Sequence, residues 1–170
     1  MGDYARGKYN IIEQPFRHGK NLWIGSYVHI RPGVTVGDNV ELRDGVWIGP
    51  GASIGSNVRI FNKAVISTEA LIGNNIYIGP RAMLVNTNFF KGDAATFEAP
   101  IVENNVRIAA GAILLPSVVI REGCIIAVGA VVTKSTEPNM VYMGVPAKAV
   151  RKVNEYERNW KIEQYYGGQN

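Results

Sequence analysis

The stretch VGDNVELRDGVWIGPGASIGSNVR, residues 36–59, decides the fold because it consists of four successive hexads of one pattern. Each hexad begins with a large aliphatic residue, Val36, Leu42, Ile48 or Ile54, and has a small or branched apolar residue at its fifth place. A period of six fits neither an α-helix nor a strand that alternates and then reverses in a hairpin. The stretch therefore predicts a repeat protein.

The same repeat extends over most of the chain in one phase. Steps of six from residue 24 meet an aliphatic residue every time as far as residue 84, and the series resumes in phase from 102 to 132. The seventeen leading residues are Ile24, Ile30, Val36, Leu42, Ile48, Ile54, Ile60, Ile66, Ile72, Ile78, Leu84, Val102, Ile108, Leu114, Ile120, Ile126 and Val132. The pattern predicts an all-β solenoid in which three hexads close one triangular coil and the leading side chains stack inward.

Several motifs within the repeat resemble the hexapeptide-repeat acyltransferases. They are the IGDNV-type hexads Val36–Val40, Ile72–Ile76 and Ile78–Ala82, the AVGAVVTK stretch Ala127–Lys134 and the closing GVPAKAVRK stretch Gly144–Lys152. The resemblance covers Ile24 to about Lys152. It implies a left-handed parallel β-helix, association of three chains into a homotrimer, and acetyl-CoA as the co-substrate.

We expect three segments along the chain. Residues 1–23 are predicted to form an N-terminal cap over the first coil, and residues 24–137 the β-helix with a protruding loop at 90–101. Residues 138–170 are predicted to close the structure and to include a docked amphipathic helix over Ala147–Tyr165. Apolar residues recur there at intervals of three and four residues: Val150, Val153, Tyr156 and Trp160.

The composition agrees with one globular domain. The chain has 170 residues, 46% of them apolar, and a formal net charge of +4. No run of like charges favours a nucleic-acid partner, whereas a small phosphate-bearing ligand suits the balance. Cys124 is the single cysteine, so no intramolecular disulfide can form. The chain has neither a signal-peptide pattern nor an apolar stretch of membrane-spanning length, and we expect a cytoplasmic protein.

The repeat fails at LVNTNFFKGD, residues 84–93. Residues 90–101 are two hexads in length but do not keep the pattern, which predicts a loop leaving one corner. Repeat proteins place such insertions on their binding face. Asn86 and Asn88 stand beside the loop, and the alternatives are a surface loop without function and asparagines that only satisfy loop backbone groups.

The resemblance implies chemistry at this corner. Where such enzymes acetylate hydroxyls, a His begins the loop and acts as the base, but the matching place here holds Asn88 or Phe89. The N-acetyltransferases of nucleotide-linked amino sugars instead carry Asn at the places matching Asn62 and Asn86. Neutral amides can orient an amine and polarise a thioester carbonyl, so Asn62, Asn86 and Asn88 are the catalytic candidates. Asn62 and Asn86 fall on successive faces, which suggests a cleft shared by two subunits.

Further residues are candidates for binding. Arg81 and Phe89 are assigned to the substrate, and a diphosphate could contact Arg31, Arg43 or Arg81. The resemblance places the pantetheine arm of CoA near two stretches of small residues, and cations close to the C-terminus suit its phosphates. These cofactor-binding candidates are Ala109, Gly111, Ala127, Gly129, Lys134, Lys148 and Arg151.

Four functions remain to be compared. The first is N-acetylation of a nucleotide-linked amino sugar in surface-polysaccharide assembly, and its rival is O-acetylation of a glycan or small-molecule hydroxyl. A third is a β-helix scaffold without catalysis. The fourth is a zinc carbonic anhydrase on the same fold, which needs three His ligands. This chain has two, His18 and His29, and no metal is expected.

Overall fold

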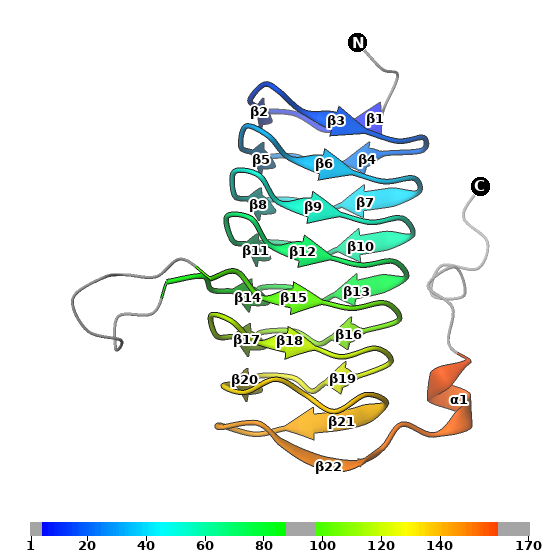
Figure 1. Ribbon diagram of the computed structural model, residues 1–170. Helices are drawn as coiled ribbons and strands as arrows, with labels where there is room; N and C mark the ends of the chain where they lie inside the picture. Colours follow the sequence, from blue (N-terminus) through cyan, green and yellow to red (C-terminus); the bar gives the residue numbers. More distant parts are fainter. Residues whose placement is uncertain (1–4, 88–97, 160–170) are drawn as a thin grey trace.

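The computed structural model describes residues 5–87 and 98–159, and over these residues the chain winds into a triangular prism (Figure 1). Its strands form three sheets, here named A, B and C. Sheet A contains β1 (Ala5–Arg6), β4 (Trp23–Ile24), β7 (Val40–Leu42), β10 (Val58–Ile60), β13 (Ile76–Ile78), β16 (Arg107–Ile108), β19 (Ile125–Ile126), β21 (Met140–Met143) and β22 (Lys148–Lys152). Sheet B contains β2 (Ile11–Ile12), β5 (His29–Ile30), β8 (Trp47–Ile48), β11 (Val65–Ile66), β14 (Met83–Leu84), β17 (Ile113–Leu114) and β20 (Val131–Val132). Sheet C contains β3 (Arg17–His18), β6 (Thr35–Val36), β9 (Ser53–Ile54), β12 (Leu71–Ile72), β15 (Ile101–Val102) and β18 (Val119–Ile120).

The register of the parallel strands confirms the predicted coil length. Ile30 pairs with Ile48, which stands three hexads later in the sequence. Tyr77 pairs with Arg107 across the break, and these two residues are five hexads apart. The insertion therefore adds two hexads' length to one coil without shifting the phase of the stack. The arrangement matches the left-handed β-helix that the resemblance implies.

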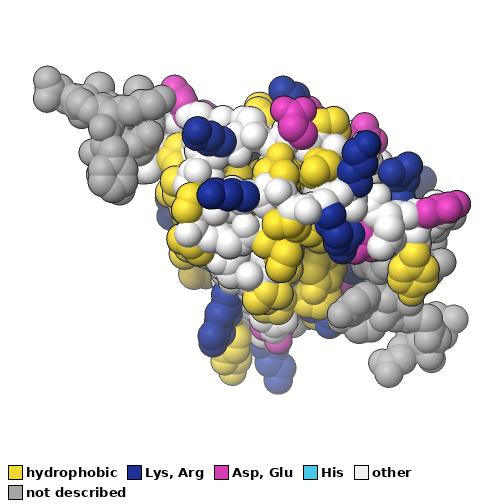
Figure 2. Space-filling view, turned by 90° about the horizontal axis from the view of Figure 1, so that it is seen from below, with side chains coloured by type: hydrophobic (Ala, Val, Ile, Leu, Met, Phe, Trp, Pro, Cys, Tyr) yellow, Lys and Arg dark blue, Asp and Glu magenta, His cyan; other side chains and the backbone are white. Residues whose placement is uncertain are grey.

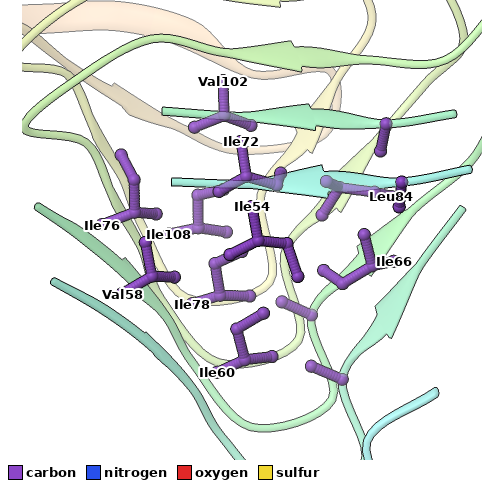
Figure 3. Packing of buried hydrophobic residues seen from close by; sticks show 14 of the residues in the cluster. Ile54, Val58, Ile60, Ile66, Ile72, Ile76, Ile78, Leu84, Val102 and Ile108 are labelled. Atoms are coloured by element: carbon purple, nitrogen blue, oxygen red, sulfur yellow. The ribbon is translucent and has the colours of Figure 1, made fainter. Parts of the chain in front are cut away.

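The core consists of the predicted leading residues. All seventeen are buried, with exposed fractions of 5% or less. Figure 3 shows three stacks meeting inside the prism, represented by Ile54 and Ile72 of sheet C, Ile60 and Ile78 of sheet A, and Leu84 of sheet B. Because each leading side chain packs on the one from the next coil, burial of this aliphatic column is the main driving force for the fold.

The N-terminal segment is a further coil of the β-helix. Strands β1, β2 and β3 pair in parallel with β4, β5 and β6. This coil covers the end of the stack, as a cap would, but with the solenoid's own geometry. The repeat was missed here because Arg6 and His18 occupy leading places. His18 lies in the first described coil, where it is half-buried and packs on Phe16 with ring centroids 5.5 Å apart.

The helix predicted over Ala147–Tyr165 is wrong at its start. Lys148–Lys152 is strand β22, which pairs antiparallel with β21 because the last coil leaves an edge of sheet A to be satisfied. The described helix is α1 (Glu155–Arg158), begun by an Asn154 capping box. Tyr156 is 87% exposed and does not dock, and Trp160 lies outside the described residues. Within the described ranges, no helix is long and apolar enough to cross a membrane.

Candidate functional site

The turn between sheets A and B, here the A/B corner, forms one continuous edge of the prism. Backbone hydrogen bonds link its coils: the N–H of Arg81 donates to the carbonyl of Asn62 at 2.9 Å, and that of Gly111 to Pro80 at 2.9 Å. The N–H of Gly129 likewise donates to Ala110 at 3.0 Å. Candidates far apart in the sequence, from Asn62 to Gly129, therefore lie on a single edge. Ala109 and Ala127 precede the two glycines on this edge.

The later coils leave this edge open. Gly111 and Gly129 both have φ of +66°, a conformation that favours glycine. A Cβ placed on either one would meet no heavy atom within 4 Å. In the coil before, the equivalent place is occupied by Arg81, which carries a side chain there. The edge at Gly111 and Gly129 thus has open space beside the backbone. The N–H groups of both glycines donate to the neighbouring coil, so it is the carbonyl groups of this edge that can accept hydrogen bonds from the amides of an extended ligand.

The insertion leaves from the opposite edge of sheet B, here the B/C corner. The N–H of Glu98 donates to the carbonyl of Asn86 at 3.0 Å, so the chain returns close to where it leaves (Figure 1). Ser117 in the next coil donates its N–H to Glu98 at 2.9 Å. The side-chain oxygen of Asn86 accepts from the Thr87 hydroxyl at 3.4 Å, and among residues 5–87 and 98–159 its amide N–H groups have no hydrogen-bond acceptor. Asn88 and Phe89 lie outside the described residues.

One chain does not bring the two asparagines together. Asn62 follows β10 at the A/B corner, whereas Asn86 follows β14 at the B/C corner, so the width of sheet B separates them. Asn62 is exposed, and its side-chain amide makes no hydrogen bond within the described part of the chain. Any site that uses both amides needs a second subunit.

The three candidate arginines differ in their partners. The Nε of Arg31 lies 3.2 Å from a Glu13 oxygen, which also contacts His29. Arg43 pairs with Glu41 and stacks over two aromatic rings, 5.0 Å from the Trp23 centroid and 5.8 Å from that of Phe61. Arg81 is exposed and its side chain contacts no carboxylate among the described residues. Arg81 is therefore the arginine available to a ligand.

The cations near the C-terminus are not gathered in one group. Lys134 follows β20 at the B/C corner, whereas Lys148 begins β22 opposite Met143, at the A/B end of sheet A. Figure 2, seen from the C-terminal end, shows Lys and Arg side chains at separate places around that end. Lys148 is thus the cation that shares the A/B corner with Gly129.

Arg151 is held by an internal ion pair. Its guanidinium donates two hydrogen bonds to the Glu157 carboxylate, at 2.6 and 2.7 Å. These bonds raise the pKa of Arg151 and lower the pKa of Glu157 from 4.5 to about 2. Arg107 of sheet A also donates to the backbone carbonyl of Glu157, and burial lowers the pKa of Arg107. Arg151 therefore fixes α1 against the prism and is not free for a phosphate.

A cation that was not predicted lies on the A/B corner beside Arg81. Lys63 occupies the same place one coil earlier, and its N–H donates to the Asp44 carbonyl at 2.9 Å. Lys63 stands three hexads before Arg81 in the sequence, and this spacing could have identified it. The hexad phase alone does not define the corners, however, because they depend on how three hexads close one coil. Over residues 5–87 and 98–159, no group of three His, Cys, Asp or Glu side chains could hold a metal ion.

Comparison with known proteins agrees with this fold. The family model of the bacterial transferase hexapeptide (six repeats) matches residues 17–50 and 99–134. A Schizosaccharomyces pombe protein described as an acetyltransferase is 50% identical over 58 residues, 34% of this chain and 28% of that protein. Galactoside O-acetyltransferase of Escherichia coli (strain K12) is 33% identical over 64 residues, 38% of this chain and 32% of the enzyme. The matches thus span about a third of the length of these curated relatives.

A solved structure extends the likeness to most of the chain. A mutant of AntD, an N-acyltransferase from Bacillus cereus, superposes with a TM-score of 0.68 and 22% sequence identity, covering 82% of this chain and 84% of AntD. At this identity the likeness concerns the fold. Residues 17–50 and 99–134 therefore match the bacterial transferase hexapeptide repeat, and the described chain has the fold of a left-handed β-helix, as the resemblance of its motifs implied.

Proposed function

We propose that the protein is an acetyl-CoA-dependent acetyltransferase that N-acetylates a nucleotide-linked amino sugar, in the cytoplasm and in surface-polysaccharide assembly. The observation that carries the proposal is the A/B corner. There Arg81 and the amide of Asn62, both without a side-chain partner among the described residues, adjoin the open backbone at Gly111 and Gly129. A diphosphate and a thioester arm can then lie on consecutive coils of one edge.

The relatives support a saccharide acceptor. The Escherichia coli relative is a galactoside O-acetyltransferase by name. AntD was solved with dTDP-4-amino-4,6-dideoxyglucose and coenzyme A. An acceptor like the AntD ligand, a nucleotide-linked amino sugar, has both a diphosphate for Arg81 and an amine for acylation.

The corners on either side of sheet B offer neutral amides for the chemistry. Asn62 and Asn86 follow β10 and β14 in the fourth and fifth coils, whereas His18 and His29 lie in β3 and β5, in the first two. A hydroxyl needs a positioned base, which is worth about 10²–10⁴ in rate. An uncharged amine already carries the lone pair that attacks. The amides at these corners therefore suit an amine acceptor better than a hydroxyl.

The reaction needs only orientation and charge stabilisation from the chain. The amine nitrogen forms a bond to the thioester carbonyl carbon while the carbon–sulfur bond breaks and the sulfur leaves with the electron pair. The proton released by nitrogen goes to the thiolate, whose conjugate acid has a pKa of about 8.5. The amide N–H groups of Asn86 can stabilise the developing oxyanion, and the amide oxygen of Asn62 can accept from the amine and orient it.

The proposed cleft is shared by two subunits of a homotrimer. The A/B corner of one subunit supplies Asn62, Arg81 and the edge at Gly111 and Gly129. The B/C corner of the neighbour supplies Asn86 and the insertion. Lys148 lies beyond Gly129 on the first of these corners and is the proposed contact for a CoA phosphate.

Kinetics with paired acceptors tests the function. We expect release of free CoA thiol with an amino sugar nucleotide and not with its hydroxyl counterpart, and losses of about 100-fold or more in kcat for N62A and N86A. Turnover of the hydroxyl compound alone would instead establish the rival O-acetyltransferase, which the named activity of the galactoside relative favours. Failure to bind CoA in calorimetry would instead support the third alternative, a β-helix scaffold without catalysis.

Mixing the two variants tests the shared cleft. In trimers assembled from equal amounts of N62A and N86A subunits, about one cleft in four combines an intact Asn62 with an intact Asn86. About a quarter of the wild-type activity should return after the mixed subunits are unfolded and refolded together. A site contained within one chain would regain none.

A further inference from the structure

Two tyrosines at the N-terminal end of the A/B corner have no role in the core. Tyr9 and Tyr27 are 73% and 66% exposed, and their rings stack with centroids 5.2 Å apart and planes at 23°. Both have positive φ, 60° and 59°, a conformation that is unfavourable for a bulky residue. The corner imposes a positive φ at this place in later coils too, for example at Lys63 and Arg81, so the conformation itself belongs to the fold. What the fold does not explain is an exposed aromatic side chain at both places, and exposed aromatic residues are candidates for binding.

The same backbone ladder places these rings on the edge that carries the cations. The N–H of Tyr27 donates to Lys8 at 3.0 Å, that of Gly45 to Ser26 at 2.9 Å, and that of Lys63 to Asp44 at 2.9 Å. One residue from each coil therefore projects from this corner at equivalent places. In order along the axis these residues are Tyr9, Tyr27, Gly45, Lys63, Arg81, Gly111 and Gly129.

A glycine separates the aromatic residues from the cations. Tyr9 covers one face of the Tyr27 ring, so the other face is turned toward the coil of Gly45, which has no side chain. The Lys63 side chain lies along that coil, with its Cγ 3.2 Å from the place that a Cβ on Gly45 would occupy. Gly45 thus leaves a vacant place in its own coil, toward which the flexible Lys63 side chain leans. Neighbouring coils are about 4.8 Å apart, so a planar ring stacked on Tyr27 would lie at this vacant place and contact the Lys63 side chain.

The charges along the edge suit a phosphate next to that ring. Lys63 and Arg81 are exposed cations whose side chains pair with no carboxylate in the described ranges. The nearest acid on this corner, Asp44, turns its carboxylate to the N–H of Ser26 at 2.7 Å. The two cations lie about 10 Å and 14 Å from Tyr27 at the coil spacing, which is within the reach of a nucleoside diphosphate.

We propose that this edge is a nucleoside diphosphate site: the base stacks on Tyr27 at the vacant place of Gly45, and Lys63 and Arg81 bind the diphosphate. The inference rests on the proposed function and extends it, because it assigns the nucleotide half of the acceptor to one edge. The sugar then continues toward Gly111, where the thioester arm is proposed to lie. The order of groups in the acceptor thus matches the order of side chains on the prism.

Two variants test the platform without disturbing the core. Y27N removes the ring and replaces it with a residue that tolerates positive φ, and G45N fills the vacant place under the same condition. Each should raise KM for a nucleotide-linked amino sugar about ten-fold, which is about 1.4 kcal/mol of lost stacking. KM for acetyl-CoA, and kinetics with the same amino sugar lacking the nucleoside, should stay unchanged. G33N is the matched control, since Gly33 has φ of +80° at the B/C corner.

Direct binding separates this inference from the proposed function. Calorimetry with UDP, dTDP and GDP should show binding to the wild type. The Kd should rise about ten-fold in Y27N, G45N and K63A and should stay unchanged in G33N. If the wild type binds them but transfers no acetyl group, the proposed function fails and the site stands. Binding and kinetics equal to the wild type in Y27N and G45N would overturn the inference. So would a change in molecular mass of Y27N without a change in nucleotide binding, because the tyrosines would then serve subunit contact.

Discussion

Two glycines on the A/B corner should respond very differently to the same small change. In G79A the new methyl group would lie 2.6 Å from the backbone nitrogen of Ala110 and 2.8 Å from the backbone carbon of Ala109. Backbone atoms of the next coil cannot move aside as a flexible side chain can. In G111A the methyl group would meet nothing within 4 Å, and only the φ of +66° opposes it.

The magnitudes follow from these two situations. Overpacking against backbone costs about 3 kcal/mol, the upper part of the usual range for such changes. A left-handed conformation costs an alanine about 1 kcal/mol. For a chain of this size, about 1 kcal/mol corresponds to about 2–4 °C in Tm. We expect Tm to fall by about 6–12 °C in G79A and by about 2–4 °C in G111A.

Thermal unfolding followed by circular dichroism, at matched protein concentration because the assembly is proposed to be oligomeric, measures both values. A third variant, G129A, repeats the open situation one coil later and should match G111A. Equal losses in G79A and G111A, or a larger loss in G111A, would refute the reasoning, since the coil spacing at Ala109 and Ala110 would then not limit the side chain.

Three further predictions concern the core, the C-terminus and the charged edge. I78A should lower stability by about 2–5 kcal/mol in urea unfolding because Ile78 is fully buried, whereas L71A, at a 48% exposed position, should change it by less than about 1 kcal/mol; similar losses would contradict the stacked core. Glu157 has a folded pKa of about 2, below its ordinary 4.5, so its ion pair stabilises the protein above pH 4.5 and is lost as pH falls toward 2. The Tm difference between wild type and E157Q should therefore shrink steadily over that window, and a difference as large at pH 2 as at pH 7 would refute the assignment. R81A should raise KM for a nucleotide-linked acceptor about ten-fold with a weaker salt dependence, while R31A, whose arginine faces Glu13, should not; equal effects would contradict the choice of Arg81.

Much of the fold was predictable because one property repeats. An aliphatic residue at every sixth place can be buried only if each coil returns to the same three faces, so residue spacing alone predicted the solenoid and its seventeen core residues. The signal weakens where burial is incomplete. Arg6 and His18 stand at leading places of the terminal coil, and the pattern did not reveal that coil. In β22 all five side chains are exposed, so the hydropathy pattern gave no signal for a strand there. The apolar residues of this region happen to be three and four residues apart, which suggested a helix.

The candidate site was predicted less completely than the fold, since corners are defined by coil closure. The sequence supplied Asn62, Asn86, Arg81 and the small residues near Gly111 and Gly129, together with the break that marks the insertion. It did not distinguish Arg81 from Arg31 and Arg43. The partner of Arg31, Glu13, becomes its neighbour only through coil stacking, and the pairing of Arg43 with Glu41 in its own coil depends on how the two side chains are turned. It also did not separate Lys148 from Lys134 and Arg151.

The sequence by itself determined the period, the inward residues and the point at which the chain leaves the stack, because these depend only on which side chains avoid water. The tertiary structure alone decided which residues share an edge, since a coil of three hexads places Tyr27, Lys63 and Arg81 in line at one corner and sets Asn86 at another. Alignment along an edge depends on the geometry of coil closure, and the hydrophobic pattern of the sequence does not determine it.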